Sequence, residues 1–159
     1  MEKFIPEVKS KLRTRIIEVP QVIYKASGIK VLGTRIKSLL FSTDIAIIKN
    51  TNANSIIAVY PFTPQLSITQ ALLEVAPVPV FVGVGGGITT GRRSIEIALQ
   101  AELMGAYGAV VNAPTKNDVI SEMYERIDIP IIATIVSEHD DYKGKLDAGA
   151  RIQLSFIVI

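Results

Sequence analysis

The most informative stretch of the sequence is VFVGVGGGI, at residues 80–88. Its first half is an apolar run rich in β-branched side chains, which predicts a strand buried within a parallel sheet. The three glycines that follow predict a sharp turn, because glycine adopts backbone conformations that other residues avoid. Residues 92–104 then carry Ile95, Leu99 and Leu103 at helical spacing. The stretch therefore predicts a strand, a glycine loop and a helix, which together form the repeating unit of an α/β fold.

The same alternation continues on both sides of this stretch. Helical patterns at residues 44–50, 67–75, 115–127 and 138–147 lie between short apolar runs that predict strands. These strands are predicted at residues 38–41, 55–60, 108–112, 130–136 and 151–159. With the strand at 78–84 this makes five βα units and a sixth strand, a pattern that predicts a parallel sheet with right-handed crossovers.

Two architectures accommodate this pattern. An open, doubly wound, flavodoxin-like sheet fits a chain of 159 residues. A (βα)8 barrel of the TIM-barrel type needs eight strands and about 250 residues, so length alone favours the open sheet. In either case we expect one α/β domain over residues 1–159, with a basic N-terminal helical segment at 1–36 and βα repeats at 37–159.

The N-terminal segment differs in charge from the rest of the chain. Residues 1–37 carry nine Lys and Arg against three Glu, whereas residues 38–159 carry eight against twelve Asp and Glu. An apolar side chain recurs every four residues from Phe4 to Ile16, which predicts an amphipathic helix that ends near Pro20. We interpret its basic face as solvated, because no aromatic platform or nucleic-acid motif accompanies it.

Composition excludes several classes of site. The chain has no cysteine, which excludes disulfides, thiolate catalysis and cysteine-held metals, and its single histidine excludes sites built from several imidazoles. The mean hydropathy of +0.36 agrees with a sheet that is buried on both faces. No apolar run reaches the roughly 20 residues of a membrane span, and the N-terminus lacks a signal sequence. A cytoplasmic protein is therefore expected.

A second stretch, LMGAYGAVVN at residues 103–112, follows the glycine loop and its helix. A strand, a glycine loop, a helix and then G-A-x-G-A-V-V resemble the phosphate-binding barrels, the ribulose-phosphate-binding group of (βα)8 proteins. Residues 146–152, LDAGARI, repeat the helix-to-strand joint. The resemblance covers residues 37–152 and implies a parallel (βα)n fold of the TIM-barrel type. More narrowly, the chain resembles an uncharacterised bacterial barrel family that carries the generic label "hydrolase".

The chain departs from this family pattern in two ways. In phosphate-binding barrels the phosphate loops usually follow strands seven and eight, whereas here the glycine loop follows the third predicted strand. The chain also ends where a seventh strand would begin, so the resemblance implies an incomplete barrel of about six strands, truncated at its C-terminus.

The glycine loop is the candidate anion site. Glycines let a backbone approach a ligand closely, and the free N–H groups and dipole at the start of the next helix favour an anion. Two arginines would add charged hydrogen bonds. The alternative is a tight turn with no ligand. The candidate ligand-binding residues are Gly85, Gly86, Gly87, Thr89, Thr90, Arg92, Arg93 and, at the end of the next strand, Asn112.

Glu138 and His139 are the candidate catalytic residues. They follow the predicted strand at 130–136, and ligands of α/β folds gather at the carboxyl ends of strands. Histidine titrates near neutrality, which makes this the best acid–base pair by residue type. The alternative is an exposed polar loop. The spacing of the acidic residues up to Asp141 matches no metal-binding pattern, so neither a metal nor a cofactor is expected.

Two functions are compatible with these observations. The first is an enzyme of the TIM-barrel type that acts on a small anionic or phosphorylated metabolite by hydrolysis, isomerisation or lyase chemistry. The second is a non-catalytic, ligand-sensing regulatory barrel whose basic N-terminal segment binds RNA or a protein partner. A flavodoxin-like signalling domain is disfavoured, because no acidic cluster follows the first strand. The open edges of an incomplete barrel predict a homo-oligomer, formed through residues 154–159 and the first strands.

Overall fold

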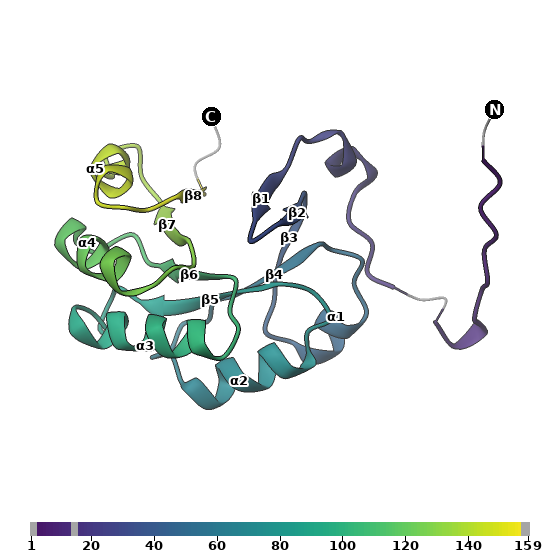
Figure 1. Cartoon of the computed structure of the whole chain (residues 1–159), viewed down its shortest axis with the longest axis horizontal. Helices are drawn as coiled ribbons and strands as arrows, with labels where there is room; N and C mark the ends of the chain where they lie inside the picture. The colour runs from purple at the N-terminus through teal and green to yellow at the C-terminus, as the bar shows by residue number, and fades with distance from the viewer. Residues whose placement is uncertain (1–2, 14–15, 157–159) are drawn as a thin grey trace.

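The computed structural model describes residues 3–13 and 16–156 of the chain (Figure 1). The elements alternate as the sequence predicts from residue 37 onward, and a short hairpin precedes them. The strands are β1 (Ile29–Val31), β2 (Thr34–Ile36), β3 (Leu39–Phe41), β4 (Ser55–Ala58), β5 (Val80–Gly85), β6 (Gly108–Val111), β7 (Ile131–Ile135) and β8 (Ile152–Ser155). The α-helices are α1 (Ile45–Lys49), α2 (Leu66–Val75), α3 (Arg92–Leu103), α4 (Asn117–Arg126) and α5 (Tyr142–Asp147).

Six of these strands form one parallel sheet in the order β3-β4-β5-β6-β7-β8. Each strand pairs with the next one along the chain, and the order never reverses. A doubly wound sheet requires such a reversal, so the flavodoxin-like alternative is wrong. The incomplete barrel of about six strands is confirmed.

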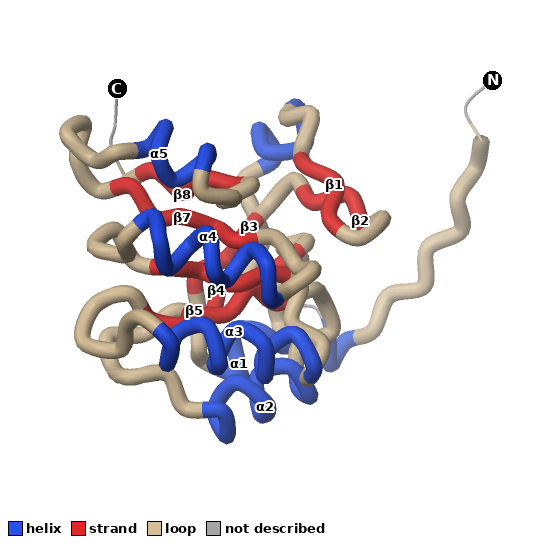
Figure 2. Tube along the Cα trace, turned by 60° about the vertical axis from the view of Figure 1, so that its left-hand side comes forward, coloured by secondary structure: helices blue, strands red, loops and turns tan. Residues whose placement is uncertain are grey.

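All five α-helices lie on one side of the sheet, because right-handed crossovers between consecutive strands return on the same side (Figure 2). The main core lies between them and the sheet. It includes Ile56, Val82 and Ala109 from the strands, and Leu72 and Ile120 from the helices, all of them buried. None of the helices in the described ranges is long and apolar enough to cross a bilayer.

The inner face of the sheet is covered by the β1–β2 hairpin. Val31 and Ile36 of the hairpin pack with Ile57, Phe81 and Val110 of three neighbouring strands to form a second, smaller core. The hairpin takes the place of a second layer of helices on this face. The hairpin residues therefore belong to the same packed body as the βα repeats. The predicted division of the domain into an N-terminal segment and βα repeats at residue 36 stays a prediction.

The sheet curls until its two edge strands converge. Phe41 ends β3, Phe156 directly follows β8, and their ring centroids lie 5.7 Å apart. These are the first and last strands of the sheet, so a contact between them requires strong curvature. The sheet therefore has the curvature of a barrel wall. The barrel is not closed, because β3 and β8 are not paired with each other in the described sheet.

The N-terminal helix expected over residues 4–16 is not formed. Apart from a short 3-10 turn at Lys11–Arg13, the described part of this segment is extended and projects away from the body (Figure 1). Phe4, Val8 and Leu12 are each at least 89% exposed. An amphipathic pattern stabilises a helix only when its apolar face packs against something, and this face has no such surface here. The predicted strand at 151–159 is shorter, and residues 157–159 lie outside the described part of the chain.

The hairpin offers a matched test of how the inner face is stabilised. Ile36 is 1% exposed, whereas its cross-strand partner Ile29 is 36% exposed. We expect Ile36→Ala to lower the free energy of unfolding by about 2–5 kcal/mol, because it leaves a cavity in the smaller core. Ile29→Ala should cost about 1 kcal/mol or less. Chemical denaturation measures both, and equal effects would contradict the packing described here.

Candidate functional site

The candidate site is a pocket of about 230 Å³ at the carboxyl ends of β4, β5 and β6. One wall is the loop after β4, which contributes residues 60–64, and the opposite wall is the glycine loop after β5. Asn112, directly after β6, closes the third side. The carboxyl ends of parallel strands meet at one edge of the sheet, so three loops distant in sequence enclose one space.

The glycine loop folds tightly on itself. Gly85 and Gly86 have φ values of 112° and 117°, which side chains other than hydrogen rarely tolerate. The Gly86 N–H donates to the Thr89 carbonyl oxygen at 2.6 Å, and the Ser94 hydroxyl donates to the same oxygen at 2.8 Å. The Gly86 amide is therefore used within the loop, whereas Gly87 faces open space.

Helix α3 begins directly after this loop without a side-chain cap. Arg92 and Arg93 line a second, larger hollow of about 660 Å³, which adjoins the smaller pocket because the two share Thr63, Ile88 and Thr89. The Arg92 Nε lies 3.9 Å from a carboxylate oxygen of Glu96. The two arginines thus flank the glycine loop from outside the smaller pocket. Thr90 is exposed and lines neither hollow.

Asn112 joins the glycine loop to the next strand, since its N–H donates to the Gly85 carbonyl at 3.0 Å. The hydroxyl of Thr115, three residues later, packs directly against Gly86. This hydroxyl is buried and makes no hydrogen bond. Thr115 is therefore not a helix cap, although helix-forming residues follow it, and α4 begins two residues later. A side chain at Gly86 would collide with Thr115, which is the local reason for a glycine there.

Sequence reasoning missed Lys145, which is only 4% exposed. Its ammonium donates to the carbonyls of Ala113 and Thr115, at 2.9 and 2.8 Å, and so ties α5 to the loop after β6. Burial lowers the pKa of Lys145, and the nearby carboxylates of Asp140 and Asp141 oppose that effect. A lysine on a short, polar helix looks exposed in the sequence, and only the fold reveals that it is buried.

Asp140 and Asp141 order the loop after β7. The Asp140 carboxylate accepts from the N–H groups of Val136 and Ser137, at 2.7 and 3.0 Å, and these two hydrogen bonds lower its pKa. The Asp141 carboxylate caps α5 by accepting from the Gly144 N–H, and this bond is the main cause of its own lowered pKa. Both carboxylates thus accept hydrogen bonds from backbone N–H groups of residues within four positions of them.

The structure brings only part of the predicted ligand-binding set to the pocket, namely Gly85, Gly87, Thr89 and Asn112, and it does not bring the predicted catalytic pair there. Glu138 and His139 lie on the loop after β7, with side chains 82% and 88% exposed. The His139 Nε2 lies 3.8 Å from a carboxylate oxygen of Glu138, and neither residue lines the described pocket. No group of three acidic or histidine side chains in the described ranges is arranged to hold a metal. The acid–base role of Glu138 and His139 stays a prediction.

The hydrogen bonds of Asp140 predict an acid-sensitive loop. Its pKa in the folded protein lies below the usual value of 3.8, so the folded state binds fewer protons than the unfolded state near that pH. The stabilisation is complete above the unfolded pKa and is lost as the pH falls through the folded pKa. We expect Asp140→Asn to flatten the decline in unfolding free energy between about pH 5 and pH 2. Asp147→Asn, an exposed site on α5, is the control, and an equal flattening there would refute the assignment.

No family model matches the chain, and no curated protein is similar to it. Solved structures do resemble it. A protein from Burkholderia cenocepacia, provisionally assigned as a phosphonomutase, matches with a TM-score of 0.59 at 15% identity over 74% of this chain and 68% of its own. A dihydrodipicolinate synthase matches with a TM-score of 0.48 at 20% identity over 57% of this chain. The synthase from Aquifex aeolicus matches with a TM-score of 0.45 at 21% identity, again over 57%.

The chain spans 37% and 36% of the lengths of these two synthases. These proteins are TIM-barrel enzymes. At 15% identity the likeness to the first of these structures concerns the fold alone, and it agrees with the sequential strand order described above. The chain therefore has a fold of the TIM-barrel type.

Proposed function

We propose that the chain is a TIM-barrel enzyme, or part of one, that binds a small anionic or phosphorylated metabolite at the carboxyl ends of β4, β5 and β6. One observation carries this proposal. Three loops enclose a pocket at the edge of the sheet where barrel enzymes hold their substrates, and one wall of that pocket is glycine backbone. Backbone without side chains lets a ligand reach the amide groups directly.

The charges around the loop favour an anion. Helix α3 carries the positive end of its dipole toward the loop, and no acidic residue occupies its first turn. Arg92 and Arg93 add two cations in the adjoining hollow, and Glu96 neutralises part of that charge. The polar side chain of Asn112 faces the same pocket and is the candidate for orienting the ligand.

The candidate reactions are isomerisation, carbon–carbon bond cleavage and hydrolysis, each of which requires a group that moves a proton. Glu138 and His139 are still proposed for this role, because their loop follows β7 at the same edge of the sheet as the pocket. Their exposure means that a bound ligand, or movement of residues 136–141, must bring one of them to the reacting atoms.

One observation favours the alternative of a ligand-sensing module. Residues 3–12 project from the body with their apolar and basic side chains exposed, as expected of a segment that binds a partner. RNA binding with a steep dependence on salt, lost when residues 1–13 are deleted, would support that function over catalysis.

The anion site is tested with phosphate monoesters, such as glycerol 3-phosphate and ribose 5-phosphate, in calorimetric titrations. We expect the double variant Arg92→Ala, Arg93→Ala to weaken binding by about 1–3 kcal/mol through the loss of charged hydrogen bonds. Gly87→Ala should leave the unfolding free energy unchanged, because the added methyl meets open space, and should weaken binding by obstructing the ligand.

Arg126→Ala is the matched control for this experiment. Arg126 of α4 lies 3.9 Å from Glu122, four residues before it, just as Arg92 lies 3.9 Å from Glu96, four residues after it. Removing it changes the net charge and an exposed ion pair, but nothing near the pocket. Equal weakening by both changes, or the absence of any phosphate-ester binding, would contradict the proposed site.

We further propose that the chain forms a homo-oligomer through the edges of its sheet. Phe41 and Phe156 are 47% and 57% exposed at the two edge strands, and Leu39 is exposed beside them. Such edges favour pairing with a second copy. Light scattering on a size-exclusion column should give a mass above 17.3 kDa that falls after Phe156→Ser. Phe62→Ser, at an exposed phenylalanine away from the edges, should not lower the mass. A wild-type monomer at all concentrations would disprove the proposal.

A further inference from the structure

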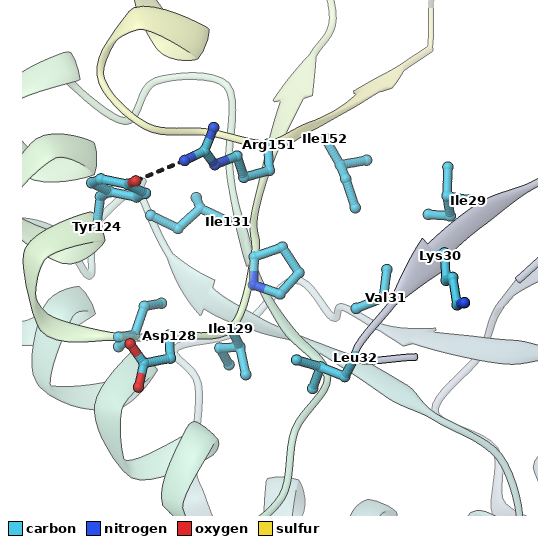
Figure 3. Close-up of a pocket in the computed structure, with 12 residues that line it drawn as sticks. Ile29, Lys30, Val31, Leu32, Tyr124, Asp128, Ile129, Ile131, Arg151 and Ile152 are labelled. Atoms are coloured by element: carbon cyan, nitrogen blue, oxygen red, sulfur yellow. Dashed lines mark hydrogen bonds between the residues drawn. The ribbon is translucent and has the colours of Figure 1, made fainter. Parts of the chain in front are cut away.

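A second site of interest is a large cavity at the opposite end of the sheet from the glycine loop. It has a volume of about 720 Å³, within the range of pockets that hold small organic ligands. One wall is β1 of the hairpin, and the other is formed by the residues that lead into β7 and β8 (Figure 3). Aliphatic residues such as Val31, Ile129, Pro130 and Ile152 supply part of its lining, and polar surface supplies the rest. The cavity therefore suits a ligand that has both an apolar body and a polar end.

Two cationic residues, Lys30 and Arg151, line this cavity, and contacts with a neighbouring side chain orient Arg151. Its Nη2 donates to the hydroxyl of Tyr124 at 2.7 Å, and its guanidinium carbon lies 5.2 Å from the centre of the same ring. This pair fixes the plane of the guanidinium and leaves its other N–H groups for a ligand. Within the described ranges, no carboxylate forms an ion pair with Arg151, and Figure 3 shows Asp128 well separated from it.

Leu32 adds a second unusual feature at the same cavity. It is the first residue of the two-residue turn between β1 and β2, and its φ of 46° is the one positive value at a non-glycine residue in the described ranges. Turns of this kind favour asparagine or glycine, so a leucine here is strained. The strained side chain lines the cavity (Figure 3). The hairpin thus keeps an apolar group at this position despite the conformational cost.

From these observations, we propose that the cavity between β1 and the amino ends of β7 and β8 binds a small carboxylate with an apolar body. The carboxylate accepts hydrogen bonds from Arg151, and the apolar body packs between Leu32 and the aliphatic wall around Pro130. A planar guanidinium matches the two oxygens of a carboxylate. The site is separate from the proposed anion site, because the two lie at opposite ends of the strands.

The test uses naphthalene-2-acetate and its uncharged analogue 2-(2-naphthyl)ethanol in calorimetric titrations of the full chain. We expect the carboxylate to bind at least about tenfold more tightly than the alcohol, since a charged hydrogen bond is lost with the latter. Arg151→Gln should weaken carboxylate binding by about tenfold or more and leave alcohol binding unchanged. Arg93→Gln, at the opposite end of the sheet, should change neither.

Leu32→Asn separates folding from binding. The variant should be at least as stable as the wild type, because asparagine tolerates the turn conformation, yet it should bind both naphthyl compounds more weakly. The proposal is overturned if neither compound binds, if Arg151→Gln binds the carboxylate as tightly as the wild type, or if naphthyl phosphate binds more tightly than the carboxylate through the same arginine. Because Arg92 and Arg93 are irrelevant to these results, failure here is distinguishable from failure of the proposed function.

Discussion

The rest of the structure depends on one constraint: both faces of a parallel sheet must be covered, while all of its crossovers lie on one side. The sequential strand order places every α-helix outside the sheet, so the inner face needs another cover. Phe81 and Val110 on that face are fully buried only because the hairpin presents Val31 and Ile36 to them. Curvature contributes as well, since it brings the edge strands close enough for Phe41 and Phe156 to touch.

This cover explains where the two cavities lie. The hairpin packs on the middle of the inner face and reaches toward the amino ends of the strands, where it leaves a gap against β7 and β8. The carboxyl ends remain free, and the loops that follow β4, β5 and β6 enclose the other pocket. The position of the hairpin thus leaves a cavity of mixed polarity, with the oriented guanidinium of Arg151, at one end of the strands and a glycine-walled pocket at the other.

The sequence predicts the features that depend on local pattern. Strands and helices from residue 37 onward follow from apolar periodicity, and the Asp44 cap of α1 follows from residue type.

Features that depend on distant contacts were not predictable. The amphipathic pattern of residues 4–16 predicts a helix, but no surface in the structure supports one. In the sequence, Arg151 is a charged residue that precedes a predicted strand. Its orientation in the structure depends on Tyr124, which is 27 residues away. Likewise, the glycine loop was predictable as a turn, whereas the use of its Gly86 amide within the loop was not.

Lys145 shows why a perturbed pKa at this edge does not by itself identify a catalytic group. Its ammonium points at two backbone carbonyls of the loop after β6, which would otherwise be buried without donors. Because that loop carries Thr115, and Thr115 packs on Gly86, the lysine stabilises the glycine loop through two steps of contact. Burial lowers the pKa of Lys145, and the nearby carboxylates of Asp140 and Asp141 oppose that effect. The lysine thus supports the wall of the pocket that carries Asn112. The opposite wall carries Phe62, which is 73% exposed. The two walls therefore differ in chemistry, with a polar amide held by backbone contacts on one side and an exposed aromatic ring on the other.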